Sequence, residues 1–437
     1  MLLQRLFGRK KISRPDPGIR WGRYSDNNKT SGKIKRWAEA EELFKKEQYA
    51  ESLDAFFDYL ADEEEENVEY ERKENNGSFR LFQGSKIVRG KFDENNLEAE
   101  IVVASMPEPG IPVMRRLLEM NFQLYYSRYA LHEGSIRMRF DTDLTTANPN
   151  KLYYGLRELA IKADKQDDLL VTEFGSVLPA DTDHILPLSE EEQEKRLKYF
   201  HLWLDKTLNY VNTLDQEKFA PAIAYLLLAV VFRIDFLLAP EGKLMQEIEK
   251  IPERHFKKEG RASAEKNQEM IDALQKLRNK PKEEILPFFF HSKHTFSIVS
   301  PQEHKQVADS IHGALQNMQW YRENNYPMIA NEIMEYGFAY CQYSFSLPRP
   351  VTEFFQLFME INHPGFFSDF GHVPVLYHEE SNRFEQELIE DIIEQINSRW
   401  RERYEKMRLN PSSLNFTNLL RFNQSFLNGV AGLNFDT

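Results

Sequence analysis

The sequence contains a single cysteine among its 437 residues, Cys341. An intramolecular disulfide and a cysteine-rich zinc site are therefore excluded. Scarce cysteine is typical of proteins from a reducing compartment. Because Cys341 stands among tyrosine and phenylalanine residues at helical spacing, we expect its thiol to be buried and structural rather than nucleophilic.

The chain also lacks a long hydrophobic run. Its longest uncharged apolar stretch, 219–232, has 14 residues, whereas a transmembrane helix needs about 20. We interpret this stretch as a buried core helix. At the N-terminus the positive charges follow a short apolar stretch, which is the wrong order for a secretory signal. These features lead us to expect a cytoplasmic protein.

Motifs for catalysis and nucleotide binding are missing too. The sequence has no His-Glu-x-x-His, no Gly-x-Ser-x-Gly, no P-loop and no dinucleotide fingerprint. Zinc sites need three or four converging ligands, and the spacing of the 11 histidines predicts no such set. We therefore expect no metal and no cofactor.

Charge is distributed unevenly. The net charge is −13, but residues 1–36 carry +9 and the remainder carries −22. An acidic body repels polyphosphates, which argues against a nucleic-acid partner. We interpret residues 1–36 as a basic flexible arm. Its first 11 residues mix apolar and basic side chains, so they either touch an anionic membrane surface weakly or stay in solvent.

What the chain does have is aromatic and aliphatic residues in two different patterns. Hydrophobic residues make up 41% of it, with 32 Phe and 19 Tyr, so a substantial core is expected. Before Ser189, segments of period two lie between helical segments; after it, helical periodicity continues to the end. We predict an α+β domain over 37–180 and an all-α domain over 188–437.

The first domain has the predicted order α-β-β-β-α-β-β-α. Helical spacing is found near 37–60, 113–120 and 150–170. Period-two spacing is found at 79–83, 86–92, 97–105, 122–131 and 135–141.

Two pairs of residues predict tight hairpin turns in this domain. Gly84-Ser85 suits a type II′ turn, and Glu133-Gly134 joins the last two strands. In the final strand, apolar side chains alternate with charged ones. This alternation predicts an antiparallel sheet with helices on one face. Farther along, Ser189 with Glu192 forms a predicted capping box at a helix start, and so do the residues of 300–303.

The element order and the run from Met114 to Phe140 (MRRLLEMNFQLYYSRYALHEGSIRMRF) resemble the type III secretion chaperone-like fold, shared with the YbjN family of bacterial proteins. The resemblance covers about 37–175. It implies an acidic, cytoplasmic, bacterial module that is often dimeric and binds a protein segment. The all-α region departs from the small chaperones of this kind.

Three arginines on the exposed face of the predicted sheet are candidate binding residues: Arg89, Arg137 and Arg139. Glutamates at 98 and 100 share that face, so cross-strand pairs would neutralise part of the charge. A ligand surface and a solvated, ion-paired face are both compatible with the pattern. The mixed signs favour the solvated face.

Three histidines are the remaining candidates: His291, His294 and His363. If a pocket in the helical domain gathered them, they would serve an enzyme as acid/base groups. If they are isolated, they are ordinary polar residues. We predict a non-catalytic adaptor or chaperone-like protein that binds a protein or peptide segment and forms a homodimer. An enzyme and a peripheral membrane factor are the alternatives.

Overall fold

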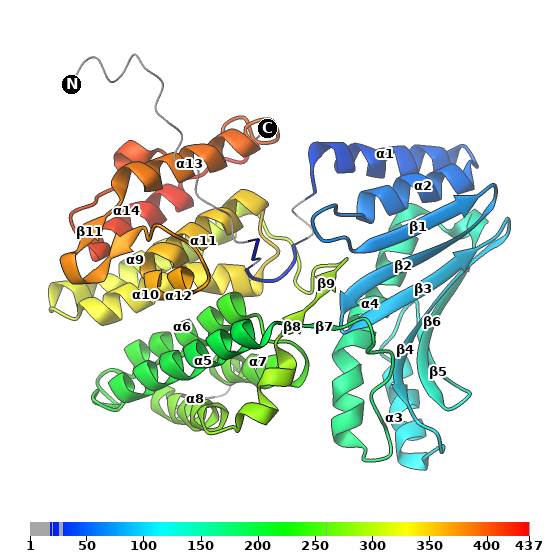
Figure 1. Ribbon diagram of the computed structural model, residues 1–437, viewed down its shortest axis with the longest axis horizontal. Coiled ribbons are helices and arrows are strands. Elements are labelled where there is room, and N and C mark those ends of the chain that lie inside the picture. Colours follow the sequence, from blue (N-terminus) through cyan, green and yellow to red (C-terminus); the bar gives the residue numbers. More distant parts are fainter. Residues whose placement is uncertain (1–17, 20, 26–28, 259, 437) are drawn as a thin grey trace.

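The computed structural model describes residues 18–19, 21–25, 29–258 and 260–436. Figure 1 shows an antiparallel sheet with its helices beside a helix-rich body. The sheet is built by the N-terminal part of the chain, and helices dominate the remainder. This mixed architecture is what the change of spacing near Ser189 predicts.

The sheet has seven strands among the described residues, in the order β1-β2-β3-β4-β6-β5, with β9 pairing with β2. All pairings in it are antiparallel. The bounds are β1 (Val68–Lys73), β2 (Asn76–Gly84), β3 (Lys86–Phe92), β4 (Asn96–Ser105), β5 (Arg128–His132), β6 (Ser135–Asp143) and β9 (Lys293–His294). The short strand β9 comes from the helix-rich part of the chain, so the two parts share one sheet.

Both predicted hairpin turns are present. Gln83 pairs with Lys86 across Gly84-Ser85, and Gly84 has a φ of +55°. A Cβ at Gly84 would lie 2.2 Å from a carboxylate oxygen of Asp164, so this position requires glycine for space as well as conformation. Between β5 and β6, the two turn residues both have positive φ, as a type I′ turn demands.

Alternate residues of each strand point to a shared apolar core. In β4 the side chains of Leu97, Ala99 and Ile101 are buried, while those between them are partly exposed. The helix α4 (Pro149–Glu173) packs across β2, β3, β4 and β6. α1 (Ser31–Lys45), α2 (Tyr49–Leu60) and α3 (Ile111–Asn121) complete this layer.

The order of elements differs from the predicted one in two places. The helical stretch at 37–60 is a pair of helices, because Glu47 adopts a φ of +60° and reverses the chain between α1 and α2. β1 adds a strand to the predicted set. Its sequence, VEYERK, has only two apolar side chains, so its period-two signal is weak.

The helix-rich part contains α5 (Glu190–Val211), α6 (Ala220–Leu238), α7 (Gly242–Phe256), α8 (Ser263–Arg278), α9 (His304–Glu323), α10 (Pro327–Ser344), α11 (Arg349–Asn362), α12 (Pro364–Asp369), α13 (Gln386–Trp400) and α14 (Leu419–Ala431). α6 lies inside its core. By length and composition this one described helix could cross a membrane, but 89% of its most apolar window is buried in the protein. The prediction of a buried core helix at 219–232 is therefore confirmed.

The second half of the predicted arm at 1–36 differs from a flexible tail. Trp21 is only 7% exposed and belongs to the core of the helix-rich part. Residues from Ser31 onward form α1. The predicted membrane contact at residues 1–11 lies outside the described residues.

Candidate protein-docking surface

The three candidate arginines of the sheet face all have acidic partners. Arg89 binds both carboxylate oxygens of Asp181, at 2.5 and 2.7 Å. The Arg137 guanidinium lies 2.6 Å from Glu100, and Arg139 lies 3.8 Å from both Glu98 and Glu100. Arg137 and Arg139 of β6 pair with glutamates of the neighbouring strand β4, and cross-strand pairs of this kind contribute about 0.2–1 kcal/mol each. The face is thus a ladder of ion pairs in which the arginine charges are largely compensated.

The candidate histidines do not form one site. His291 lies on β8 (Phe290–His291), which pairs with β7 (Leu186–Pro187). His294 lies on β9, a strand of the main sheet, and burial lowers its pKa to about 4, so the ring is neutral at pH 7. His363 joins α11 to α12 in the helix-rich part, where its Nε2 lies 2.9 Å from Glu335.

His363 belongs to a buried network of charged residues. The Arg233 guanidinium lies 2.7 Å from Glu335 and 2.7 Å from Glu332, and its carbon stands 5.8 Å from the centre of the Trp203 ring. Burial opposes ionisation of Glu335, but Arg233 and His363 outweigh that effect and lower its pKa to about 2. These side chains satisfy one another. The arrangement links α6 to α10 through ion pairs.

An open hollow of about 390 Å³ lies at the start of α9. None of the three candidate histidines lines it. Its walls are Pro301, Gln302, Glu303, His304, Pro348, Tyr404 and Phe435. This hollow therefore does not bring the three candidate histidines together.

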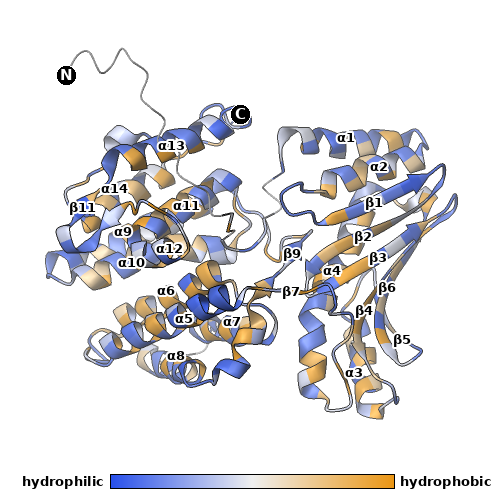
Figure 2. Ribbon diagram, in the orientation of Figure 1, coloured by the Kyte–Doolittle hydropathy of each residue, from blue (hydrophilic) through white to orange (hydrophobic). Residues whose placement is uncertain are grey.

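A different feature stands out on α3. Part of its ribbon is hydrophobic in Figure 2, and several of its large apolar side chains are exposed to solvent. Ile111 is 79% exposed, Leu118 62% and Phe122 93%. They lie at positions i, i+7 and i+11, so they share one side of the helix. Tyr125 and Tyr126, in the loop that follows α3, are also exposed, at 92% and 41%. We call these five residues the α3 surface.

The opposite side of α3 packs against the sheet and holds the helix in place. Val113, Leu117 and Met120 are buried in the core of the sheet. α3 therefore has two apolar stripes, one packed and one exposed. Contiguous exposed patches of large apolar side chains mark interaction sites more often than isolated exposed residues do.

The loop that follows α3 is anchored by Glu158 of α4. Its carboxylate accepts hydrogen bonds from the backbone N–H groups of Tyr125, Tyr126 and Ser127 at 2.8–2.9 Å. Burial raises the pKa of this carboxyl, but the backbone N–H donors outweigh it and hold the pKa below its usual range. The exposed aromatic rings thus stand on a fixed backbone.

Asn121, the last residue of α3, closes the neighbouring edge of the sheet. Its side-chain oxygen accepts from the Tyr129 N–H at 2.7 Å, and its amide nitrogen donates to the Tyr129 carbonyl at 3.3 Å. These are the groups of β5 that point away from β6. An incoming strand is therefore excluded from the middle of this edge.

The other edge of the sheet is β1. Phe82 donates to the Asn67 carbonyl at 3.0 Å, which sets the register of β1 against β2. The backbone groups of Val68, Tyr70 and Arg72 consequently point away from β2. Of the two edges, β1 is the one available for an added strand.

Sequence reasoning missed the α3 surface. It counted Leu118 among the apolar residues of a helix at 113–120 and assigned 122–131 to a strand. The signal that was available is the second apolar stripe at 111, 118 and 122, which a core helix with one buried side does not need. No protein-family model matches the chain, and no curated protein matches it in sequence.

Proposed function

We propose that this chain is a non-catalytic protein-binding protein of the bacterial cytoplasm, of an adaptor or chaperone-like kind. The observation that supports this is the α3 surface, on which Phe122 and Tyr125 are each more than 90% exposed. Aromatic side chains dominate the energetics of protein interfaces. Because the Glu158 anchor already orders the loop backbone, less conformational entropy is lost when a partner binds.

The proposed partner at this surface is a second copy of the chain. A two-fold interface must be complementary to itself. If two α3 helices pack antiparallel about their midpoint, Ile111 faces Phe122 of the partner subunit along an apolar stripe about 16 Å long. The same pairing brings Arg115 near Glu119 of the partner subunit. Arg115 is exposed and has no ion-pair partner among the described residues, so its charge is available.

The remaining open edge, β1, is the proposed place for an extended segment of another protein. Adding a strand to a sheet edge satisfies the backbone groups that point outward there. Val68, Tyr70 and Arg72 supply those groups on β1. A dimer joined through α3 keeps this edge free, because α3 lies beside β5 at the opposite edge.

Light scattering after gel filtration tests the proposal. Over a rising protein concentration, the wild-type mass should approach twice the 51.6 kDa of one chain. The variant Leu118→Glu/Phe122→Glu should remain at the mass of one chain with an unchanged circular dichroism spectrum. Leu202→Glu is the matched control, because Leu202 is also an exposed helical leucine, at 48%. A wild-type protein that stays monomeric at the highest concentration, or equal effects of both variants, contradicts the proposal.

A further inference from the structure

Residues 21–25, Trp-Gly-Arg-Tyr-Ser, run over the helix-rich part without regular secondary structure, and we call them the N-terminal strap. The strap is bound chiefly through its side chains. Trp21 enters an aromatic cluster, with ring centroids 5.2 Å from Phe366, 5.4 Å from Phe367 and 5.4 Å from Phe370. These angled ring contacts define a pocket with the shape of an indole.

The next residue, Gly22, occupies a position with no room for a side chain. The Gly22 N–H donates to the Phe236 carbonyl at 2.9 Å, and Gly22 has a φ of +79°. A Cβ at this position would lie 2.4 Å from the Phe236 ring. Both the space and the conformation therefore demand glycine.

Arg23 is selected by charge. Its guanidinium pairs with Asp235 and lies 3.1 Å from Glu249, and it stands 5.4 Å from the centre of the Tyr343 ring. Burial opposes the charge on Arg23, but Asp235 and Glu249 outweigh it and raise its pKa. Asp235 is a buried residue of α6, so an arginine is required to compensate it.

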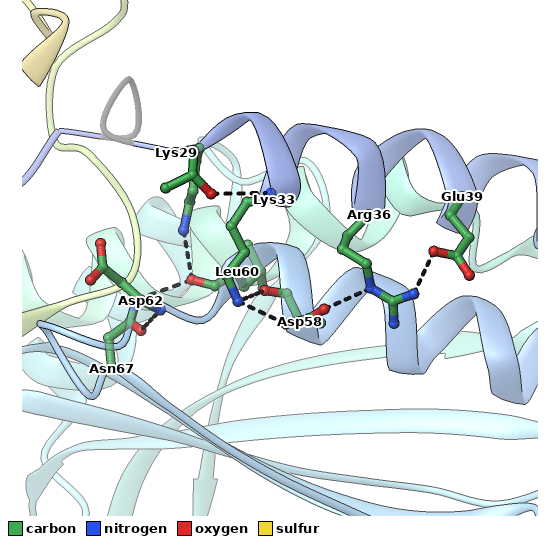
Figure 3. A network of polar contacts seen from close by, with 9 residues as sticks. Lys29, Lys33, Arg36, Glu39, Asp58, Leu60, Asp62 and Asn67 are labelled. Atoms are coloured by element: carbon green, nitrogen blue, oxygen red, sulfur yellow. Dashed lines mark hydrogen bonds and ion pairs between the residues drawn. The ribbon is translucent and has the colours of Figure 1, made fainter. Parts of the chain in front are cut away.

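The end of the strap is held by polar contacts. The Ser25 hydroxyl lies 2.7 Å from the Ser346 hydroxyl and 2.7 Å from the Leu347 carbonyl. Beyond the strap, Lys29 donates to the Leu60 carbonyl at the end of α2, as Figure 3 shows. Lys29, the first described residue after the strap, thus contacts the sheet part.

We propose that the groove under the strap is a recognition site for a linear segment with tryptophan, glycine and arginine in succession, and that residues 21–25 are its exchangeable ligand in cis. Each of the three successive residues is recognised by a different feature. An aromatic pocket binds Trp21, the Phe236 ring leaves no room for a Cβ at position 22, and the buried Asp235 carboxylate pairs with Arg23. Pockets for successive side chains are how peptide-binding grooves achieve specificity. This site is separate from the α3 surface and does not depend on it.

The test uses the full chain with a protease site placed within residues 26–28. After cleavage, the fragment 1–25 should stay bound through gel filtration, since its side-chain contacts do not need the covalent link. A labelled peptide of residues 18–25 should then exchange into the groove, measured by fluorescence anisotropy. Peptides with Trp21→Ala, Gly22→Ala or Arg23→Ala should bind at least tenfold more weakly, and so should the wild-type peptide to an Asp235→Asn protein.

Two controls and three adverse results make the test decisive. A scrambled peptide should not bind, and Leu118→Glu should leave peptide binding unchanged, which separates this site from the α3 surface. The proposal is overturned if the cleaved protein unfolds, because the strap is then a folding element. It is also overturned if the folded, cleaved protein never exchanges its fragment, or if it binds wild-type and substituted peptides equally.

Discussion

The Glu158 carboxylate of α4 accepts the backbone N–H of Tyr125 at 2.8 Å, across 33 residues of sequence. Through this bond and those to the next two residues, a helix buried against the sheet sets the position of an exposed aromatic loop. The bond therefore links the core of the protein to its proposed docking surface.

Glu158→Gln tests that link. The amide keeps the size of the side chain but replaces charge-assisted hydrogen bonds with neutral ones. We expect a loss of about 1–3 kcal/mol in the free energy of unfolding, measured with urea at pH 7. Amide hydrogen exchange should accelerate at Tyr125, Tyr126 and Ser127. Glu94→Gln, at an exposed loop position, is the control and should change neither quantity.

The same variant has a defined pH dependence. The folded-state pKa of Glu158 lies below its unfolded value, so the stabilisation is complete above the unfolded pKa of about 4.3 and is lost as the pH falls through the lower folded value. Wild type and Glu158→Gln should therefore differ most near pH 7 and converge below about pH 4. A constant difference across this range would show that the carboxylate charge is not responsible.

Two carboxyl groups where α4 meets α7 should make the stability of the protein change with pH in the opposite direction. A Cβ at Gly242, the first residue of α7, would lie 2.3 Å from a carboxylate oxygen of Asp168. Burial, reinforced by Asp167, raises the pKa of Asp168 to about 6, and burial raises that of Glu241 to about 7. Because the folded state keeps these protons longer than the unfolded state, stability falls as the pH rises from about 4 towards 7.

We therefore expect the wild-type free energy of unfolding to decrease by about 1–3 kcal/mol between pH 5 and pH 8. Asp168→Asn and Glu241→Gln each remove one titrating group, so each variant should show a flatter profile. Urea unfolding at several pH values measures this. If the wild type and both variants show the same dependence of stability on pH, Asp168 and Glu241 are not the groups responsible.

Ion pairs in the core should contribute much more to the free energy of unfolding than ion pairs on the sheet face. Arg233→Ala leaves Glu335 and Glu332 buried without their cation, so we expect a loss of about 3–5 kcal/mol. Arg139→Ala removes an exposed partner at 3.8 Å and should cost less than about 1 kcal/mol. Equal losses in a denaturant titration would mean that the buried network is not compensated as described.

Local signals in the sequence predicted local structure well. The turn at Gly84-Ser85 follows from the conformation that glycine permits, and Ser189 does accept the N–H of Glu192 at the start of α5. The predicted capping box at 300–303 is wrong: α9 begins at His304, because the Ser300 carbonyl accepts the Ser346 N–H and holds that segment extended.

Features that depend on distant partners were not predictable. The strand expected at 122–131 begins only at Arg128, because Glu158 captures the preceding backbone. β9 has two residues and exists only through pairing with β2, more than 200 positions away. Trp21 carries no local sign of the pocket that buries it.

At the candidate site, too, local features were predictable and contacts with distant residues were not. Arg137 pairs with Glu100, one of the two glutamates that the alternation places on the same sheet face, whereas no spacing indicated the partner of His363, which is Glu335. The α3 surface was hidden for a physical reason. An exposed leucine such as Leu118 has the same identity as a buried one, and the spacing of two apolar stripes does not say which stripe packs against the sheet.

The central claim is that two α3 helices meet antiparallel with Arg115 beside Glu119 of the partner subunit. The most direct measurement is the dimer dissociation constant, by analytical ultracentrifugation, for Arg115→Glu, Glu119→Arg and the double variant. Each single reversal places like charges together and should weaken the dimer at least tenfold, while the double reversal should restore it. The account is contradicted if the single variants have the wild-type dissociation constant. It is also contradicted if the double variant loses as much binding free energy as the two single variants lose together.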